Sequence, residues 1–494
     1  MTQLVALVGI YMLISIGIGV WAAQRVKNTA DYALAGRSLP LVMVITTTFA
    51  TWFGSETVLG LPGRFIEGGI AGVIEEPFGS GMALILVGMF FARKLYNMNL
   101  LTIGDFYRRR FGQHVELACS ILIIISYLGW VGAQVAALGL VINLLTEGAI
   151  SVAAGMTIGT LVVLIYTVYG GMWSVAVTDF FQMIIIIAGL VGVAYFAGTM
   201  AGGFDKVVAF ADSRELFNPW PEAGATNWLF WISAAMTMMI GSIPQQDVFQ
   251  RVMSAKSAGI ASAGPIIGGT FYIFFAFVPM FIVVAAVLAM PGVGMDMLEN
   301  NPQGLLPTLI RDYMPMWLRV VFFGAVLSAV MSTASATMLA PTTTFVENVL
   351  QNYVKIKGRE LLYMRGTLVI FAMAVLFYSL WFEGTAIYDM VAMAYQFPVI
   401  GAFWPLVLGI YWKRANSQGV WLSIILGTIT WTVLTVTPLA DVFPNVLGGF
   451  IVAGISMVIG SLLPNKSESI LDKLEKTSLK AQNASAKRVA VINN

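Results

Sequence analysis

Three small residues in the second half of the chain have a spacing that suits the binding of a hard cation. Ala329, Ser332 and Thr333 stand at positions i, i+3 and i+4 of an apolar segment, so on a helix their groups share one face. Sodium prefers oxygen ligands, as calcium and magnesium do. Two hydroxyls, completed by backbone carbonyls from an unwound partner helix, would hold the ion in a cage of low charge. Close packing between helices through small residues and hydroxyls is the alternative.

Several carboxylates lie in or beside apolar segments, where an uncompensated charge is costly. Glu56 falls in a segment interrupted by glycine and proline, and a carboxylate inside a membrane is by default a functional candidate. Glu56 could meet a cationic ammonium group, bind a proton or a sodium ion, or pair with Arg64. Asp179 stands at the start of an apolar run, where capping of a helix N-terminus is the simpler alternative. We expect Glu75 and Glu76 nearer the outer surface, as vestibule charges.

Aromatic residues beside Glu56 suggest a site for a cation of another kind. If the helix persists locally, the i, i+4 spacing puts Trp52 and Glu56 on one face, and Trp130 comes from a later segment. Ring faces attract an alkylammonium ion by cation–π interaction, and the acid balances its charge. Packing is the alternative role for both tryptophans. A neutral sugar would instead need amides and hydroxyls, and Gln134 and Gln245 offer amides.

The sequence lacks the residues that most enzyme chemistry requires. His114 is the only histidine, and Cys119 is the only cysteine, so no His/Cys cluster could hold zinc or iron. No G-x-x-x-x-G-K-[ST] phosphate loop is present. The formal net charge is +2, and the basic residues are spread out, which gives no indication of nucleic-acid binding. We therefore expect a chain that is not an enzyme and has no cofactor, and transport is the working class.

The elements that position these residues are predicted to be membrane-spanning helices. The chain is 58% hydrophobic and 11% charged, against about 25% charged for a soluble domain. A crossing needs roughly 20 helical residues. Thirteen apolar runs meet this need, the first from Leu4 to Ala23 and the others beginning near Pro40, Pro77, Glu116, Ser151, Thr178, Asn227, Gly259, Leu318, Gly366, Ala386, Gln418 and Val446.

The basic residues predict the orientation of these helices. If the runs cross alternately, all of the 27 Lys and Arg residues fall on one face except Arg64, Lys206, Arg214, Arg311 and Arg319. The positive-inside rule then places the N-terminus outside and the C-terminus in the cytoplasm. An even number of helices would scramble this segregation.

Two of the runs are interrupted at matching places. The second contains a Gly54–Ser55 pair with Pro62 downstream, and the seventh contains Gly241–Ser242 with Pro244. Glycine and proline weaken a membrane helix, which is tolerated where neighbours or a water-filled cavity satisfy the freed backbone. Matched interruptions in two halves are typical of the binding site of a secondary transporter. Because the offset is five helices, an odd number, the two halves would have opposite orientations.

Three motifs together resemble the sodium:solute symporter family over roughly residues 1 to 460. They are Gly60-Leu61-Pro62-Gly63 after the first interruption, Tyr169-Gly170-Gly171-Met172-Trp173-Ser174-Val175-Ala176-Val177-Thr178-Asp179 before the sixth helix, and Ala329-Val330-Met331-Ser332-Thr333 in the ninth. The resemblance implies an all-α membrane protein with a LeuT-type inverted repeat of five plus five helices, two to six against seven to eleven. It also implies sodium-coupled transport by alternating access.

The resemblance also implies a sodium site. Carried over by position, its ligands are the backbone carbonyls of Ala50, Phe53 and Ala329 and the hydroxyls of Ser332 and Thr333. The residue that matches Asp179 lies on the sodium exit route in this family, and in some members it forms a second sodium site with serines of the ninth helix. Ser335 is present for that site, but Ala336 replaces a hydroxyl found in those members.

Within the family, the pocket motifs look most like the branch that includes high-affinity choline transporters. Trp52 and Trp130 fall where that branch has the aromatic walls of its cage, and Ser80 and Gln245 stand at two other cage positions. The cage is therefore incomplete. With Gln134 and Glu56, these residues make up the predicted substrate site.

We expect a transporter domain over residues 1–463 and a polar cytoplasmic tail over 464–494, in the plasma membrane (the inner membrane of a bacterial cell). The predicted function is sodium-coupled symport of a small organic solute, preferably an amine or quaternary ammonium compound. The alternatives are a neutral zwitterion such as proline, a sugar, or a non-transporting sensor built on a symporter core. The expected partners are Na+, the solute and the lipid bilayer, and the sequence does not indicate an oligomeric state.

Overall fold

Helices make up the architecture of this chain. The computed structural model describes residues 2–290, 292, 296–297 and 304–464, and the predicted tail lies outside them apart from Pro464. Within that part of the chain, β-structure is limited to one isolated bridge between Leu39 and Ala255. The all-α prediction is confirmed for it.

The elements of the first half, with η marking π or 3-10 segments, are α1 (Thr2–Ala23), α2 (Thr29–Leu34), η1 (Ala35–Arg37), α3 (Leu41–Trp52), η2 (Glu56–Gly60), α4 (Leu61–Gly72), η3 (Ile74–Gly79), α5 (Ser80–Leu86), η4 (Val87–Phe91), α6 (Ala92–Asn97), α7 (Ile103–Phe111), α8 (Gln113–Leu145), α9 (Val152–Met200) and α10 (Phe204–Ser213). Those of the second half are α11 (Ala225–Gly241), α12 (Gln246–Met253), α13 (Ala258–Phe275), α14 (Phe277–Ala289), α16 (Leu305–Tyr313), α17 (Met316–Thr344), η6 (Phe345–Val349), η7 (Leu350–Asn352), α18 (Glu360–Trp381), α19 (Ile387–Gly401), α20 (Phe403–Tyr411), α21 (Ser417–Val436), η8 (Pro438–Asp441) and α22 (Asn445–Leu462).

Among the described residues, nine helices are long and apolar enough to cross a membrane, and α19 with α20, bent by 42°, makes a tenth. The predicted second and seventh runs are each split, and the helices that remain are too short to be counted as spans. Helix α3 has 12 residues and α11 has 17. The fifth and sixth runs share one helix. The structure therefore supports nine or ten spans by length, and the number thirteen stays a prediction.

The bend in helix α9 shows that the predicted boundary between the fifth and sixth runs was misplaced. It has 49 residues and would be about 74 Å long if straight, over twice the roughly 30 Å of a hydrocarbon core. It bends at Gly171 (φ 49°, ψ −140°), where the carbonyl of Tyr32 leaves no room for a Cβ atom. The predicted start of the sixth run near Thr178 was wrong by about two turns, because the hydrophobic pattern continues through the bend without a polar break.

The two predicted interruptions are confirmed as breaks in the helices. Helix α3 ends at Trp52, and the chain becomes helical again at Glu56 through η2 and then α4. Helix α11 ends at Gly241, and α12 begins at Gln246. Each break frees backbone groups in the middle of the bundle.

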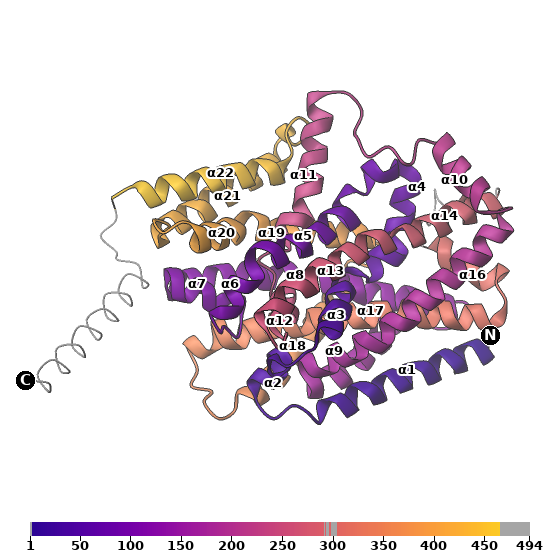
Figure 1. Ribbon diagram of the computed structural model, residues 1–494, viewed down its shortest axis with the longest axis horizontal. Coiled ribbons are helices and arrows are strands. Elements are labelled where there is room, and N and C mark those ends of the chain that lie inside the picture. The colour runs from indigo at the N-terminus through magenta and orange to yellow at the C-terminus, as the bar shows by residue number, and fades with distance from the viewer. Residues whose placement is uncertain (1, 291, 293–295, 298–303, 465–494) are drawn as a thin grey trace, which may run out of the picture.

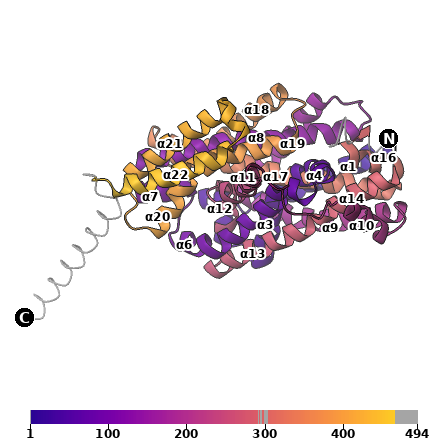
Figure 2. The same ribbon diagram turned by 90° about the horizontal axis from the view of Figure 1, so that it is seen from above.

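Helix α17 lies at the centre of the bundle, and every residue from Phe322 to Thr344 is buried. It packs against α3, α8, α9, α12 and α18, and it stays among the other helices in both views (Figures 1 and 2). Helices α21 and α22 pack against each other at one edge, coloured yellow in Figure 1. The break in α3 and the hydroxyl-rich part of α17 therefore meet in the protein interior.

Candidate functional site

The break after α3 places one predicted sodium ligand opposite another. The backbone N–H of Gly54 donates to the carbonyl of Trp52 (2.7 Å) instead of continuing the helical pattern. The carbonyl of Ala50 accepts the hydroxyl of Thr333 (3.1 Å), which comes from α17. The carbonyl of Phe53 belongs to the first non-helical residue (ψ 68°). Neutral oxygens from α3 and α17 thus face each other at the break, as a sodium site requires.

Asp179 is tied directly to this group of residues. Its carboxylate accepts hydrogen bonds from Thr47 of α3 (2.6 Å) and from Ser332 of α17. The helix-cap alternative was wrong, because Asp179 lies about two turns beyond the bend at Gly171 and binds side chains. The carboxylate joins α3, α9 and α17, and it is fully buried.

Ser335 does not contact Asp179 in the same way. Its hydroxyl donates to the carbonyl of Ser332 in its own helix (2.9 Å) and lies beside the Tyr166 hydroxyl. That tyrosine in turn donates to the carbonyl of Met331 (3.0 Å). The structure thus joins Asp179 by a hydrogen bond to Ser332, one of the predicted sodium ligands, whereas Ser335 bonds within its own helix.

Glu56 lies at the same break in α3, where Gln134 of α8 bonds to it. Gln134 of α8 donates its amide N–H to Glu56 Oε2 (2.7 Å), and its own carbonyl accepts the backbone N–H of Ser55 (3.1 Å). A Cβ added at Gly54 would lie 2.8 Å from Thr333 Oγ1, 2.9 Å from Glu56 Oε2 and 3.0 Å from Gln134 Oε1. Three oxygens from three elements therefore converge beside Gly54.

The proposed pairing of Glu56 with Arg64 was wrong. Arg64 instead forms an ion pair with Asp389 near the surface, with both side chains more than 40% exposed. One turn of π-helix and one turn of α-helix separate Glu56 from Arg64, and Glu56 points into the bundle. Within the described part of the chain, the Glu56 carboxylate therefore forms no ion pair with a basic residue.

The predicted aromatic walls are in contact with each other. The rings of Trp52 and Trp130 stack with centroids 5.1 Å apart and planes 18° apart. Tyr395 of α19 tilts against both, at 5.5 Å and 5.2 Å, and Tyr127 stacks on Trp130 at 5.9 Å. Because the rings fill the space between them, a solute would have to enter by separating Trp52 from Trp130.

Sequence reasoning missed three residues of this cluster, namely Tyr127, Asp247 and Tyr395. Tyr127 donates to Asp247 Oδ1 (2.6 Å), and the backbone N–H of Asp247 donates to the Tyr127 hydroxyl (2.9 Å). The spacing of Tyr127 and Trp130, i and i+3 on α8, was an available signal. Tyr395 was a polar-tipped residue inside an apolar run, which was a weaker signal.

Gln245 stands at the N-terminus of α12, and its amide donates to Ser126 of α8 (2.9 Å). Its carbonyl oxygen is one of several buried atoms without a hydrogen-bond partner among the described residues. Those at or near the rings are the donors Trp52 Nε1 and Trp130 Nε1, the hydroxyl Tyr395 Oη, and the acceptors Glu56 Oε1, Asp247 Oδ2 and Gln245 Oε1.

Arg251 does not lie where the predicted distribution of basic residues placed it. It was assigned to the cytoplasmic face, but it is fully buried and donates to the carbonyl of Thr47 and to Thr51 Oγ1 (2.7 Å). Its charge acts on Asp179 and Asp247. This guanidinium therefore balances part of the negative charge of these two buried carboxylates.

Ser80 lies in a different polar cluster. Its hydroxyl donates to the carbonyl of Pro77 (3.2 Å) and lies beside the Glu76 carboxyl. Glu76 was predicted to be a vestibule charge, but only 1% of it is exposed. That prediction was wrong, because η3 turns the side chain inward to Thr57 of η2.

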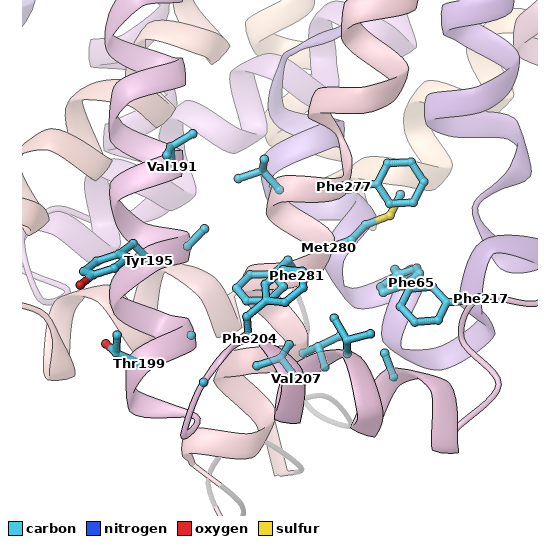
Figure 3. Close-up of a pocket in the computed structure, with 17 residues that line it drawn as sticks. Phe65, Val191, Tyr195, Thr199, Phe204, Val207, Phe217, Phe277, Met280 and Phe281 are labelled. Atoms are coloured by element: carbon cyan, nitrogen blue, oxygen red, sulfur yellow. The ribbon is translucent and has the colours of Figure 1, made fainter.

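One cavity lies apart from all of these residues. It has a volume of about 600 Å³, and its lining from α4, α9, α10 and α14 is almost entirely apolar. Figure 3 shows the rings of Phe204 and Phe281 against each other there, and the hydroxyl of Tyr195 pointing away. The hydroxyl of Thr199 donates to its own helix, so the lining presents little that could orient a polar solute.

Comparison with known proteins agrees with this geometry. The model of the sodium:solute symporter family matches residues 32–427. The chain belongs to the sodium:solute symporter family. Among its relatives are the high-affinity choline transporter 1 of Caenorhabditis elegans (25% identical, covering 86% of this chain and 76% of the relative) and the sodium/pantothenate symporter of Haemophilus influenzae (24% identical, covering 95% and 97%).

The fold is shared with a Na+-coupled sialic acid symporter, solved in a substrate-bound outward-open state. The TM-score is 0.82 at 19% sequence identity, covering 94% of this chain and 99% of that one. The predicted LeuT-like architecture, sodium-coupled symport of a small organic solute, and location as a multi-pass plasma-membrane protein are therefore confirmed at the level of the family.

Proposed function

We propose that this symporter binds one sodium ion at the break in α3 and carries a protonated amine against the aromatic cluster of Trp52, Trp130 and Tyr395. The observation that carries the proposal is the set of buried, unpartnered acceptors at Glu56, Asp247 and Gln245 beside these rings. An alkylammonium ion matches the acidic groups by charge and the rings by cation–π attraction.

The proposed sodium ligands are the carbonyls of Ala50, Phe53 and Ala329 with the hydroxyls of Ser332 and Thr333. The contact of Thr333 with the Ala50 carbonyl supports this set, because it brings oxygens of α17 and the broken α3 to one point. Asp179 stabilises the ion from behind Ser332 and lies on its route to the cytoplasm. A second sodium ion at Asp179 and Ser335 has less support, since Ser335 bonds within its own helix.

The unpartnered atoms favour an amine with N–H groups over a quaternary ammonium. Glu56 Oε1, Asp247 Oδ2 and Gln245 Oε1 can only accept hydrogen bonds, and a quaternary ammonium has none to give. A hydrogen bond to a charged group contributes roughly 1.5–3 kcal/mol. The choline transporters among the relatives bind a quaternary compound by name, so this preference distinguishes the present site from theirs.

A neutral zwitterion such as proline, or a sugar, is the second candidate. The free N–H of Trp52 and the carbonyl of Gln245 would suit such a solute. It would leave the charge of Glu56 with less compensation, although Arg251 acts on Asp247, and this disfavours it in a membrane interior.

We also propose thirteen crossings with the N-terminus outside and the C-terminus in the cytoplasm, and a repeat of helices two to six against seven to eleven. Residues at the start of α1 and the end of α22 lie at opposite ends of the long axis (Figure 1), as an odd number of crossings requires. Helices α6 and α7, which carry five basic residues, lie toward one end, and α10 and α16 lie toward the other.

The test is a panel of primary to tertiary amines, quaternary ammonium compounds, zwitterions and sugars, screened for sodium-dependent thermal stabilisation of the purified protein. A ligand at 100 times its Kd adds about 2.7 kcal/mol of stability. We expect amines with N–H groups to stabilise the protein in Na+ and much less in K+.

The hits are then tested on Glu56→Gln and Trp52→Ala, with Trp317→Ala as a control at an exposed tryptophan. Both site variants should lose at least tenfold in amine affinity, and the control should not. Stabilisation by a zwitterion or sugar alone, or amine binding that neither site variant changes, would refute the assignment of an amine to this cluster.

A further inference from the structure

Glu76 is a buried carboxyl group that the proposed sodium and amine sites do not use. It lies on η3 in the interior, and it faces Thr57 of η2, just beyond the break in α3. Among the described residues its Oε2 has no hydrogen-bond partner, and the nearby Ser80 hydroxyl donates to the carbonyl of Pro77. The hydrogen bonds around Thr57 bear on whether Glu76 is ionised or protonated.

The hydroxyl of Thr57 has three oxygen neighbours at hydrogen-bond distance. They are the carbonyl of Trp52 (2.8 Å), the hydroxyl of Tyr272 (2.9 Å) and Oε1 of Glu76 (3.2 Å). A hydroxyl donates one hydrogen and accepts two. The Trp52 carbonyl and Oε1 of Glu76 both accept from the Thr57 hydroxyl, the carbonyl at the shorter distance, so they share its single hydrogen. With Oε1 sharing one hydrogen and Oε2 without a partner among the described residues, an ionised Glu76 would be poorly compensated in this interior, and the neutral acid is favoured.

The charges around Glu76 also favour its neutral, protonated form. The charged groups that act on it are Glu56 and Glu75, both acidic. Tyr388 and Tyr395 of α19 interact electrostatically with Glu76, and Tyr272 of α13 bonds to the same Thr57 hydroxyl. Helices α5 and α11, which pack against η3, contain no titratable residue. Arg64 of α4 acts on Glu75 and pairs with Asp389. Two ionised carboxylates without a cation would be costly in this low-dielectric interior.

The hydrogen bonds around Thr57 are also too short and too complete to leave room for a metal ion. The three oxygens bond to Thr57 at 2.8–3.2 Å, as hydrogen-bonded oxygens do. A proton is therefore the ligand that this cluster fits. It would join Glu76 to the backbone of Trp52, two residues from a proposed sodium ligand.

We propose that Glu76 is a proton-binding site of the transport cycle, loaded when the broken segment of α3 closes on Thr57 and unloaded when that segment opens. Loading adds one proton from water to the Glu76 carboxylate and forms its bond to Thr57. Unloading breaks that bond and returns the proton to water on the side to which the site is then open. The sodium-coupled symporter thus moves or senses a proton at a group separate from its sodium ligands, whatever its solute.

The first test is infrared difference spectroscopy of the purified full-length protein in lipid. Wild type should show the carbonyl stretch of a buried, protonated carboxylic acid that shifts on hydrogen–deuterium exchange. Glu76→Gln should remove that band, and Glu75→Gln, one residue away, should keep it. A band that survives Glu76→Gln and disappears in Glu56→Gln, or no such band in wild type near neutral pH, overturns the proposal.

The second test measures sodium affinity by tryptophan fluorescence as a function of pH and needs no solute. Because the proton stabilises the closed break that presents the Ala50 and Phe53 carbonyls, sodium affinity should fall as pH rises through the titration of Glu76. One linked proton limits the change to about tenfold per pH unit. Glu76→Gln, which mimics the neutral acid, should keep the affinity high and flat. Equal pH dependence in wild type and Glu76→Gln refutes the link, whereas sodium binding that is absent at every pH contradicts the proposed sodium site instead.

Discussion

The replacement of Asp179 by asparagine tests whether a buried carboxylate helps to hold sodium. Asparagine has almost the same shape, and the hydroxyls of Thr47 and Ser332 can each donate or accept, so both contacts can be kept. The change therefore removes the charge and little else. Asp179 is fully buried, so solvent does little to screen that charge.

The expected magnitude follows from the position of Ser332. A sodium ion bound to Ser332 Oγ would lie about 5 Å from the carboxylate that accepts the hydrogen of the same hydroxyl, and at an effective dielectric constant of about 20 the attraction is roughly 3 kcal/mol. Loss of 3 kcal/mol corresponds to a Kd about a hundredfold higher. Arg251 also acts on Asp179, so in Asp179→Asn the Arg251 guanidinium loses part of its compensating charge. We therefore expect the variant to be slightly less stable in the absence of sodium.

Sodium titrations of purified protein, followed by tryptophan fluorescence or calorimetry with K+ keeping the ionic strength constant, give this Kd directly. Ser335→Ala is the matched control, since that hydroxyl bonds to its own helix. The control should change the sodium Kd less than threefold. If Asp179→Asn is folded and binds sodium within threefold of wild type, the carboxylate does not act on the ion, and the ion is not bound beside Ser332.

Two further predictions follow from the same contacts. Replacing Ser332 and Thr333 together by alanine removes the only side-chain oxygens of the proposed sodium site, so sodium-dependent uptake into proteoliposomes should be lost; normal uptake would falsify that site. Gly171→Ala places a Cβ against the backbone of α2 and should lower stability by roughly 1–3 kcal/mol more than Gly148→Ala, which also has a positive φ but faces open space. Equal melting temperatures for the two glycine variants would show that the bend in α9 does not depend on this close approach.

The sequence predicted the parts of the fold that depend on local chemistry. Gly54, Ser55 and Pro62 marked the first break because glycine and proline weaken a helix wherever they stand. The spacing of Ser332 and Thr333 predicted a shared face because helical geometry alone sets it. The charge segregation also predicts an orientation, which stays a prediction.

The remaining features depend on which helices meet, and a single sequence does not show that. Arg251 reads as a loop charge, but α12 packs under α3 and buries it. Glu76 reads as a surface charge, but η3 turns it toward Thr57. Tyr395 is separated from Trp52 by more than 300 positions, and only the packing of α19 on α8 brings their rings together.

If sodium and solute bind where we propose, Gly54 provides a physical basis for their coupling. An oxygen of the proposed sodium site, Thr333 Oγ1, and the oxygens of Glu56 and Gln134 on the solute side all approach the same small residue. Because no side chain separates them, a cation on either side changes the electrostatic field at the other within a few ångströms, in an interior that screens weakly. Two cations that share acidic oxygens would repel, so Glu56 must compensate both for the two sites to fill together. This places Glu56 between the ion and the amine, and it explains why a neutral Glu76 is preferable to a second charge beside it.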